Sequence, residues 1–526
     1  MRLFPTRPAL DIAVAAASLV LVGILLFQPA IVAWGGALIT GLSLARAITL
    51  LNVARVRSAG FEMVWRGTGR SARVVKGQTV ELHAEVRNRD TRAVRFAASR
   101  VVASPNVAIE VVPAAGEVPA GGRLEVLVKV RGKRVGRHGL FGLGLEMLGS
   151  PGLFEVPLTF ANPFGIEVLP ATTPSRRAAL RSGGSAIGVR PSRRSGDASE
   201  FSELRDHQFG DPLKRVAWKA SARRGKLMVR EYEIEERETV WLLLDVSVEL
   251  WAGRIGAAPL DLAIDCAAEL VRQHLRAGHE VGLELIAPGG TTRVAAGRGT
   301  GQEHRLFAAL AHTPSTLDPG RSGLDERGIA QRVLEHAAVL APAAAAQVSP
   351  AELDGIAALA REQLEQAPFP EAQIAAPTPR ESSLRSYLAA FGISAPPRLE
   401  AERARTDPLL GEAIAKHCSQ RATSLVYVLS PLPDAQRLAL LGPVLRRARR
   451  TRSQLRWLHA AELPGLEPAS DVLGQMARTA ARLRTDTERR LAALALRRLG
   501  IETSLCISAE TLPEASSADP KGHRAA

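Results

Sequence analysis

The sequence predicts a multidomain, membrane-anchored chain with an N-terminal helical hairpin, a β-sandwich, and an α/β domain interrupted by a helical insertion. Two long apolar runs predict the hairpin, and period-two alternation within residues 59–170 predicts the sandwich. A strand, helix, strand pattern after residue 236 predicts a Rossmann-like parallel sheet. The 526 residues, 46% of them hydrophobic, are enough for several separate cores.

Composition excludes some classes of function. The formal net charge is +15, from 68 basic and 53 acidic residues, which suits an anionic surface as readily as nucleic acid. Aromatic residues are only 4% of the chain, too few for the stacking platforms of a single-strand binder. Cys266, Cys418 and Cys506 lie far apart and indicate neither a disulfide framework nor a zinc site.

Residues 1–58 predict a transmembrane helical hairpin. The apolar runs Ala9–Phe27 and Ala30–Leu51 are each near the ~20 residues that span a bilayer, and Pro29 breaks the helix between them. A cleaved signal peptide is the alternative, but its apolar region has ~7–15 residues and no second span follows. Arginines flank only the outer ends, so the positive-inside rule predicts that the rest of the chain is cytoplasmic. These arginines are Arg2, Arg7, Arg46, Arg55 and Arg57.

Residues 59–170 predict a small β-sandwich. Short β-branched runs alternate with Gly, Pro and Asn turns, which is typical of half-buried antiparallel strands. The predicted strands are Thr79–Val86, Val107–Val112, Leu124–Val130 and Phe154–Phe160.

The α/β domain is predicted in two parts, residues 236–313 and 423–510. Val240–Asp245 is a fully buried type of strand, Pro259–Ala277 is an amphipathic helix stopped by Gly278, and Val281–Ile286 is the next strand. Residues 314–422, rich in Ala, Pro and Glu, predict a helical insertion between the two parts. The stretch 171–235 is a linker that ends in a charged motif, and 511–526 is a polar tail expected to be disordered.

The charged motif is the most specific signal in the sequence. It comprises Glu200–Arg205, Gly210–Arg223 and Leu227–Glu233, and it resembles the signature of a bacterial family, domain of unknown function fifty-eight. The layout resembles that family over residues 1–315 and 424–510, although His207 stands where the family has Tyr. The resemblance implies a von Willebrand factor A-like α/β domain on the cytoplasmic side of the bacterial inner membrane, to which the hairpin anchors the chain. It also implies protein partners, namely a MoxR-type AAA+ ATPase and transglutaminase-like membrane proteins.

Two interpretations of the motif remain open. Its opposite charges favour an ion-paired strap that fastens the linker against the α/β domain, since structural ion-pair networks are common. The alternative is a partner-binding surface. The strap predicts that Arg215→Ala and Trp218→Ala lose thermal stability, whereas the surface predicts normal folding and a lost partner. The candidate residues are Arg205, Gly210, Asp211, Arg215, Trp218, Ser221, Arg223, Glu231 and Glu233.

The resemblance also implies a Mg²⁺ site, which the sequence predicts to be degraded. The first loop should read Asp-x-Ser-x-Ser, and here Asp245 and Ser247 match while Glu249 replaces the second Ser. Thr300 is the candidate for a further loop, and Pro431 stands where the family generally has Asp. Asp245 and Ser247 can instead cap the loop by hydrogen bonds. We therefore expect no cofactor, and partner binding through shape and charge.

Catalysis is not expected, because the sequence has no phosphate loop, no HExxH and no GxSxG elbow. The leading hypothesis is a protein-interaction or assembly module with a chaperone-like role beside the AAA+ ATPase. The alternative is a cytoplasmic-face binder of anionic lipid or nucleic acid through an Arg-rich helix, although nucleic acid is not the expected partner. The arginines of that segment are Arg446, Arg447, Arg449, Arg450, Arg452 and Arg456.

Overall fold

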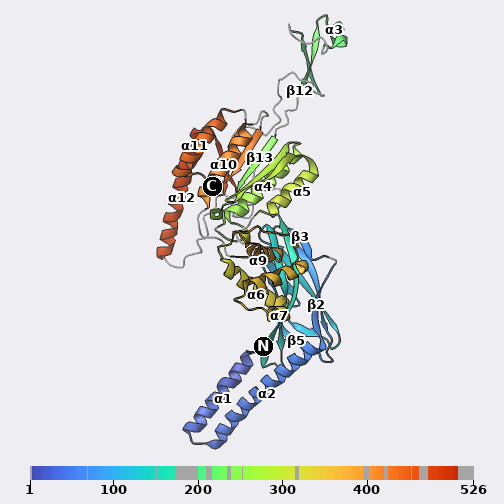
Figure 1. Ribbon diagram of the computed structural model, residues 1–526, viewed down its shortest axis with the longest axis vertical. Helices are drawn as coiled ribbons and strands as arrows, with labels where there is room; N and C mark the ends of the chain where they lie inside the picture. The colour runs from blue at the N-terminus through green and yellow to red at the C-terminus, as the bar shows by residue number, and fades with distance from the viewer. Residues whose placement is uncertain are drawn as a thin grey trace, which may run out of the picture.

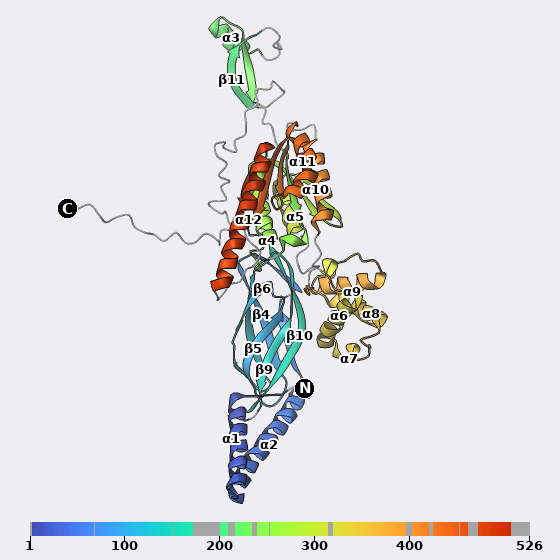
Figure 2. The ribbon, with the colours of Figure 1, turned by 90° about the vertical axis from the view of Figure 1, so that its left-hand side faces the viewer.

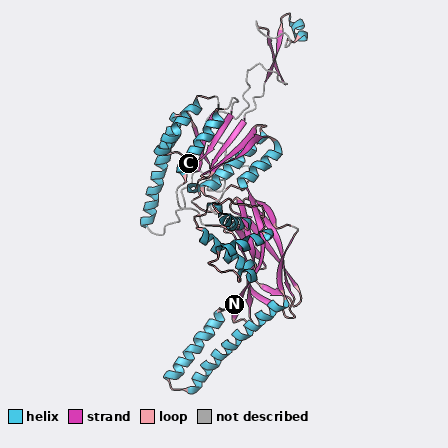
Figure 3. Cartoon of the chain, viewed as in Figure 1, coloured by secondary structure: helices cyan, strands magenta, loops and turns pink. Residues whose placement is uncertain are grey.

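The computed structural model shows a multidomain chain with a helical hairpin at one end and a two-stranded arm at the other (Figures 1 and 2). Helices and strands segregate into a strand-rich sandwich, a mixed α/β domain and a purely helical insertion (Figure 3). The structure describes residues 3–506 except 68, 150, 172–199, 209–215, 234–238, 252, 314–318, 396–401, 420–423, 452 and 461–471.

The hairpin consists of α1 (Arg7–Leu25) and α2 (Pro29–Ala59). Both helices are long and apolar enough to cross a membrane, with mean hydropathies of 2.2 and 1.6. Pro29 takes the first position of α2, where its missing N–H costs nothing. The two helices approach closely at Gly35, where a Cβ atom would lie 2.6 Å from Cγ2 of Val20.

The second helix of the hairpin continues into the sandwich. Its 31 residues span about 46 Å, whereas a bilayer core is about 30 Å thick, so its last turns lie beyond the apolar segment. Val53 and Val56 in these turns are buried in the sandwich core. Arg55 Nε also lies 3.0 Å from Asp90 Oδ2. The hairpin and the sandwich are therefore joined by packed helix.

The sandwich has two sheets whose inner faces share one core. Ala84, Val86, Val126, Val128 and Val130 are fully buried, as the period-two pattern predicts. All four predicted strands are confirmed: Val107–Val112 has the predicted bounds, and the other three are longer than predicted. The first sheet has the order β1-β10-β9-β5-β7, with β3 also paired to β10, and the second has the order β2-β4-β8-β6. The bounds are β1 Phe4–Pro5, β2 Phe61–Arg66, β3 Ser71–Val75, β4 Thr79–Asn88, β5 Val94–Ala103, β6 Val107–Val112, β7 Gly116–Val118, β8 Arg123–Gly132, β9 Gly136–Leu148 and β10 Phe154–Leu169.

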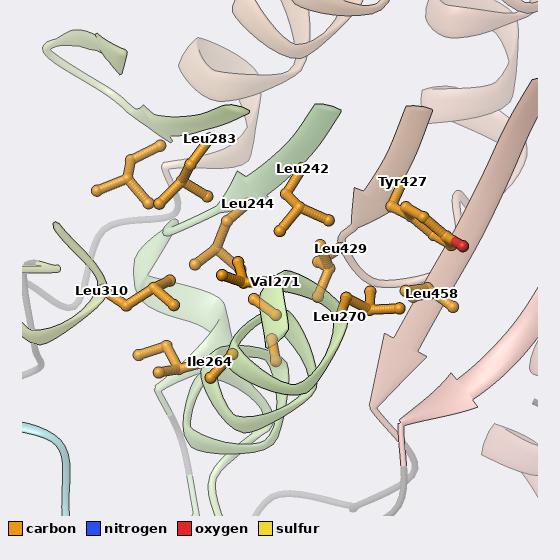
Figure 4. Packing of buried hydrophobic residues seen from close by; sticks show 14 of the residues in the cluster. Leu242, Leu244, Ile264, Leu270, Val271, Leu283, Leu310, Tyr427, Leu429 and Leu458 are labelled. Carbon is orange, nitrogen blue, oxygen red and sulfur yellow. The ribbon is translucent and has the colours of Figure 1, made fainter. Parts of the chain in front are cut away.

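The α/β domain has a six-stranded mixed sheet in the order β15-β14-β13-β16-β17-β18, with only the edge strand β15 antiparallel among the described strands. Leu242 and Leu244 pack toward α4 (Figure 4), while Trp241 and Leu243 pack toward α10 and α11 on the other face. The predicted helix before Gly278 is confirmed as α4. The bounds are β13 Thr239–Asp245, α4 Pro259–Arg276, β14 Glu280–Ala287, β15 Gly290–Gly297, α5 Gly299–Ala311, α10 Arg403–Cys418, β16 Ser424–Leu429, α11 Ala435–Arg449, β17 Gln454–Ala460, α12 Val472–Arg498 and β18 Glu502–Cys506.

The helical insertion forms its own core and lies beside the sandwich (Figure 2). Gly139 N donates to Gly392 O at 3.3 Å, and Arg137 Nη2 lies 2.7 Å from Glu371 Oε1. Helix α10 is different, because Leu410 and Ile414 pack on the sheet. The insertion therefore ends before α10, not at residue 422. Its helices are α6 Glu326–Leu340, α7 Pro342–Ala345, α8 Leu353–Gln363 and α9 Pro379–Ala390.

Candidate functional site

The first candidate site lies at the C-terminal edge of the mixed sheet, between β13 and β16. Asp245 ends β13, and Ser430 directly follows β16. The chain passes from one side of the sheet to the other at these two strands, which is the topological switch point where open α/β sheets bind ligands.

Asp245 is buried and engaged by hydroxyl groups. Its Oδ1 accepts hydrogen bonds from the backbone N–H of Ser247 at 3.0 Å and from the Ser247 hydroxyl at 2.6 Å. Its Oδ2 accepts a hydrogen bond from the Ser430 hydroxyl at 2.8 Å. The carboxylate therefore ties the ends of two neighbouring strands together, as the loop-capping alternative anticipated.

Arg437, near the start of α11, is a site residue that the sequence reasoning missed. Its Nε lies 2.9 Å from both carboxylate oxygens of Asp407 on α10, and its Nη2 lies 2.6 Å from Oδ1. The same Nη2 donates to Ser430 Oγ at 3.1 Å and lies 3.9 Å from Asp245 Oδ2. A buried guanidinium thus sits between two buried carboxylates.

The Oε1 atom of Glu249 binds the start of a helix and not this cluster. Its Oε1 accepts hydrogen bonds from the backbone N–H groups of Glu402 and Arg403, at 2.9 and 3.1 Å. These groups open α10, where a carboxylate satisfies unpaired N–H donors and the positive end of the helix dipole. The Glu that replaces the expected Ser therefore anchors a helix.

The placement of Thr300 corrects the sequence prediction. Strand β15 runs antiparallel to β14, with Gly297 opposite Val281 at the start of β14, whereas Asp245 is opposite Ile286 near its end. Thr300 follows β15, so it lies at the other edge of the sheet from Asp245. The sequence did not show that the chain turns back through an antiparallel strand before α5.

The residues at this edge do not fit the Mg²⁺ site that the resemblance implies. Arg437 brings a positive charge to Asp245, Glu249 binds a helix start, and Thr300 is at the opposite edge. The carboxylate of Asp434 is also engaged, since it caps α11 by accepting a hydrogen bond from Arg437 N at 2.8 Å. Within the described part of the chain, no group of three or more His, Cys, Asp or Glu side chains is placed to hold a metal ion.

The same edge of the α/β domain is joined to the sandwich. Arg134 makes a two-pronged buried ion pair with Asp261 at the start of α4, with Nε and Nη2 each 2.9 Å from a carboxylate oxygen. Lys76 Nζ donates to Gly256 O at 2.9 Å. Val135 of the sandwich lies in the core of the α/β domain. The chain's own sandwich therefore partly covers this sheet edge.

The second candidate site is the arm that carries the charged motif. It consists of β11 (Glu200–Asp206), the short helix α3 (Trp218–Arg224) and β12 (Met228–Glu233), with β11 and β12 antiparallel. Both views show it beyond the α/β domain, at the opposite end of the molecule from the hairpin (Figures 1 and 2).

The arm brings some of the predicted motif residues together. Ser221 is buried and its Oγ accepts from Met228 N at 2.8 Å, which fastens α3 to β12. Trp218 is 63% exposed, and Leu227, which precedes β12 in the same arm, is 45% exposed. Arg223 is exposed as well. Arg205, Glu231 and Glu233 are placed only as strand residues, and Gly210, Asp211 and Arg215 lie outside the described residues.

Comparison with solved structures yields only weak likenesses. A PapD-like domain of human CEP192 is 18% identical with a TM-score of 0.17, over 21% of this chain and 87% of that chain. The Caenorhabditis elegans MSP family member WR4 is 8% identical with a TM-score of 0.15, over 21% of this chain and 99% of that chain. TM-scores this low do not establish a shared fold.

Sequence relatives are found among uncharacterized bacterial proteins. Over 119 residues the chain is 29% identical to an uncharacterized protein of Mycobacterium bovis, covering 23% of this chain and 38% of that protein. Two uncharacterized proteins of Mycobacterium tuberculosis match with the same values. The chain thus spans less than half the length of these relatives. A family model described as protein of unknown function DUF58 matches residues 203–339, from the arm to α6, and confirms the family resemblance for that part of the chain.

Proposed function

We propose that this chain is a membrane-anchored docking module that holds a protein partner at the end of the molecule away from the membrane. The observation that carries the proposal is the exposed Trp218 on the arm. A large aromatic side chain in water is an unusual feature of a soluble surface, and Trp is enriched among the residues that dominate binding energy at protein interfaces. The arm's position clear of the α/β domain supports a partner surface over a strap.

The α/β domain supports the same assignment. Its strand order, with one antiparallel edge strand, is compatible with the von Willebrand factor A-like domain that the family resemblance implies. In such a fold the C-terminal sheet edge is the expected ligand site, yet here that edge is partly covered by the sandwich. Binding through the arm leaves that covered edge undisturbed.

The location and the partner follow from the hairpin and the family resemblance. Arginines flank only the outer ends of the two apolar helices, which favours a cytoplasmic position for the large domains at a bacterial inner membrane. A MoxR-type AAA+ ATPase is the partner that the resemblance implies, and the chain would then act in a chaperone-like role. No catalytic step is proposed.

The test compares Trp218→Ala with Leu440→Ala in the full-length tagged chain, purified from its native membrane. Leu440 is a matched control, because it is 52% exposed but lies on α11. We expect Trp218→Ala to recover much less AAA+ ATPase while its thermal unfolding midpoint stays unchanged. Loss of thermal stability without loss of the ATPase would favour the strap and contradict the proposal.

A second candidate function uses the arginines of α11. Arg446, Arg447, Arg449 and Arg450 are exposed, and the described residues provide none of them with an ion pair. A Cβ atom at Gly500 would lie 2.9 Å from Arg449 Nε, which brings the end of α12, with Arg497 and Arg498, next to them. Such a surface suits an anionic ligand.

A binding assay distinguishes the two candidate functions. The alternative predicts that vesicles containing anionic lipid, or duplex DNA, retain the chain in a salt-dependent way. A charge-reversing pair, Arg446→Glu with Arg450→Glu, should abolish that retention and leave ATPase recovery intact. Salt-dependent DNA binding would rank the alternative first. Arg456 is not part of this surface, since it pairs with Glu502 at 3.2 Å, and Arg452 lies outside the described residues.

A further inference from the structure

The buried cluster at the C-terminal sheet edge requires a positive charge. The side chains of Asp245 and Asp407 are 1% and 6% exposed, and both reach the guanidinium of Arg437, which is itself 6% exposed. Two carboxylates buried side by side are strongly unfavourable unless a cation lies between them. The guanidinium of Arg437 supplies that cation here.

The oxygen atoms around Arg437 are the kind that a hard divalent cation prefers. Asp245 and Asp407 supply carboxylate oxygens, and Ser430 supplies a hydroxyl oxygen 3.1 Å from the Arg437 Nη2 atom. The Ser247 hydroxyl adjoins the same carboxylate, 2.6 Å from Asp245 Oδ1. Mg²⁺ and Mn²⁺ bind carboxylates, hydroxyls and water in preference to nitrogen or sulfur.

We propose that the guanidinium of Arg437 occupies the position of a divalent cation at this sheet edge. The site is therefore closed to Mg²⁺ and Mn²⁺ in the native chain and becomes a divalent cation site when Arg437 is removed. The proposal is independent of partner docking by the arm, because it concerns only the side chains of β13, β16, α10 and α11 and the loops between them.

The guanidinium of Arg437 is part of the chain and, unlike a bound metal ion, cannot dissociate from the cluster. Arg437 belongs to α11, and it bonds Asp407 of α10 and Ser430 after β16. The two helices and the strand end are therefore held in one arrangement whatever the cation concentration around the protein. The α/β domain should accordingly show no Mg²⁺-dependent change in stability.

The test titrates Mn²⁺ into the detergent-solubilised full chain and into variants of it, with binding followed by calorimetry and stability by thermal unfolding. The native chain should bind no Mn²⁺ at this edge, and its unfolding midpoint should be the same with Mn²⁺ and with EDTA. Arg437→Ala should unfold at a lower temperature, bind Mn²⁺ at least about a hundredfold more tightly than the native chain, and regain stability on binding. Adding Asp245→Asn to Arg437→Ala should remove that binding.

Arg380→Ala is the matched control. It also frees two carboxylates, since Arg380 pairs with Glu326 at 2.6 Å and with Asp354 at 3.2 Å. These carboxylates lie on the insertion, and Asp354 is 84% exposed. This variant should gain no Mn²⁺ binding. If Arg437→Ala folds poorly without metal, expression with Mn²⁺ should restore folded protein, and Arg437→Ser should behave in the same way.

Three results would overturn the proposal. The first is Mn²⁺ binding by the native chain that Asp245→Asn abolishes, because the site would then be open. The second is a folded Arg437→Ala that gains no Mn²⁺ binding. The third is failure of both opening variants to fold even with Mn²⁺ present, which would show that Arg437 does more than supply a cation.

Discussion

Replacing Arg134 with Ala should weaken the junction between the sandwich and the α/β domain. The side chains of Arg134 and Asp261 are 7% and 5% exposed, so their ion pair is buried. Removing one partner of such a pair typically costs about 3–5 kcal/mol, because an uncompensated charge stays behind. Asp261 still accepts from Gly256 N at 3.0 Å and from Ala258 N at 3.1 Å, so we expect about 3 kcal/mol, the lower end.

The assay is thermal unfolding of the full chain in detergent, followed by tryptophan fluorescence. Trp241, Trp251 and Trp457 are buried in the α/β domain and report its transition. A loss of about 3 kcal/mol should lower the midpoint by about 6–12 °C for a domain of this size class. The expected change is therefore well outside the scatter of such measurements.

The control is Arg89→Ala, which removes an ion pair of similar length at the surface. Arg89 Nη2 lies 2.7 Å from Glu62 Oε1, but the two side chains are 63% and 43% exposed. Exposed pairs contribute at most about 1 kcal/mol. If Arg134→Ala shifts the midpoint no more than Arg89→Ala does, the reasoning that this junction depends on a buried charge pair is refuted.

Three further changes test individual contacts. Glu249→Ala should cost about 1–2 kcal/mol by removing the carboxylate at the start of α10, and faster hydrogen exchange in α10 would show it. The hydrogen bond from His312, with help from nearby arginines, lowers the pKa of Glu167 to about 2, so native stability relative to Glu167→Gln should be full above about pH 4.5 and fall toward pH 2; equal acid sensitivity would contradict this. Tyr387→Phe should cost about 1 kcal/mol, since the hydroxyl lies 2.8 Å from Nδ1 of His336, whose pKa burial lowers to about 4; an unchanged melting midpoint of the insertion would contradict this.

Much of the fold could be predicted because local pattern and burial agree. Helix α4 shows an apolar face ended by Gly278, and the structure buries that face against the sheet. The hairpin follows from apolar length and from Pro29, which the structure places at the first position of α2. Strand β13 is apolar from Val240 to Leu244 because helices cover both faces of its sheet.

Glycine-rich β9 escaped prediction because its pattern is set by neighbours distant in sequence. Gly136, Gly139, Gly142 and Gly144 interrupt the alternation that marks a strand. At Gly139 a Cβ atom would lie 2.1 Å from Phe391 O of the insertion, so a side chain there would push the insertion away. No local signal reveals a strand whose composition serves a contact with a helix more than two hundred positions later.

The candidate site was only partly predictable for the same reason. Asp245 and Ser247 could be read from one loop, and the structure holds them together. Arg437 could not, because its place depends on α10 and α11 packing side by side on the sheet. An Arg in the first turn of a helix is ordinary, and only the fold shows that it reaches two buried carboxylates.

The two ends of the α/β domain are suited to different tasks. At the C-terminal sheet edge, Arg134 and Lys76 of the sandwich bond to groups around α4, and α2 runs directly into the sandwich core. Each of these described junctions is packed or ion-paired, so motion of the α/β domain relative to the hairpin would have to break buried contacts. These contacts therefore fix the position of the α/β domain relative to the hairpin. The arm lies at the other end of the α/β domain, away from these junctions, and it exposes a large apolar side chain, Trp218, to solvent.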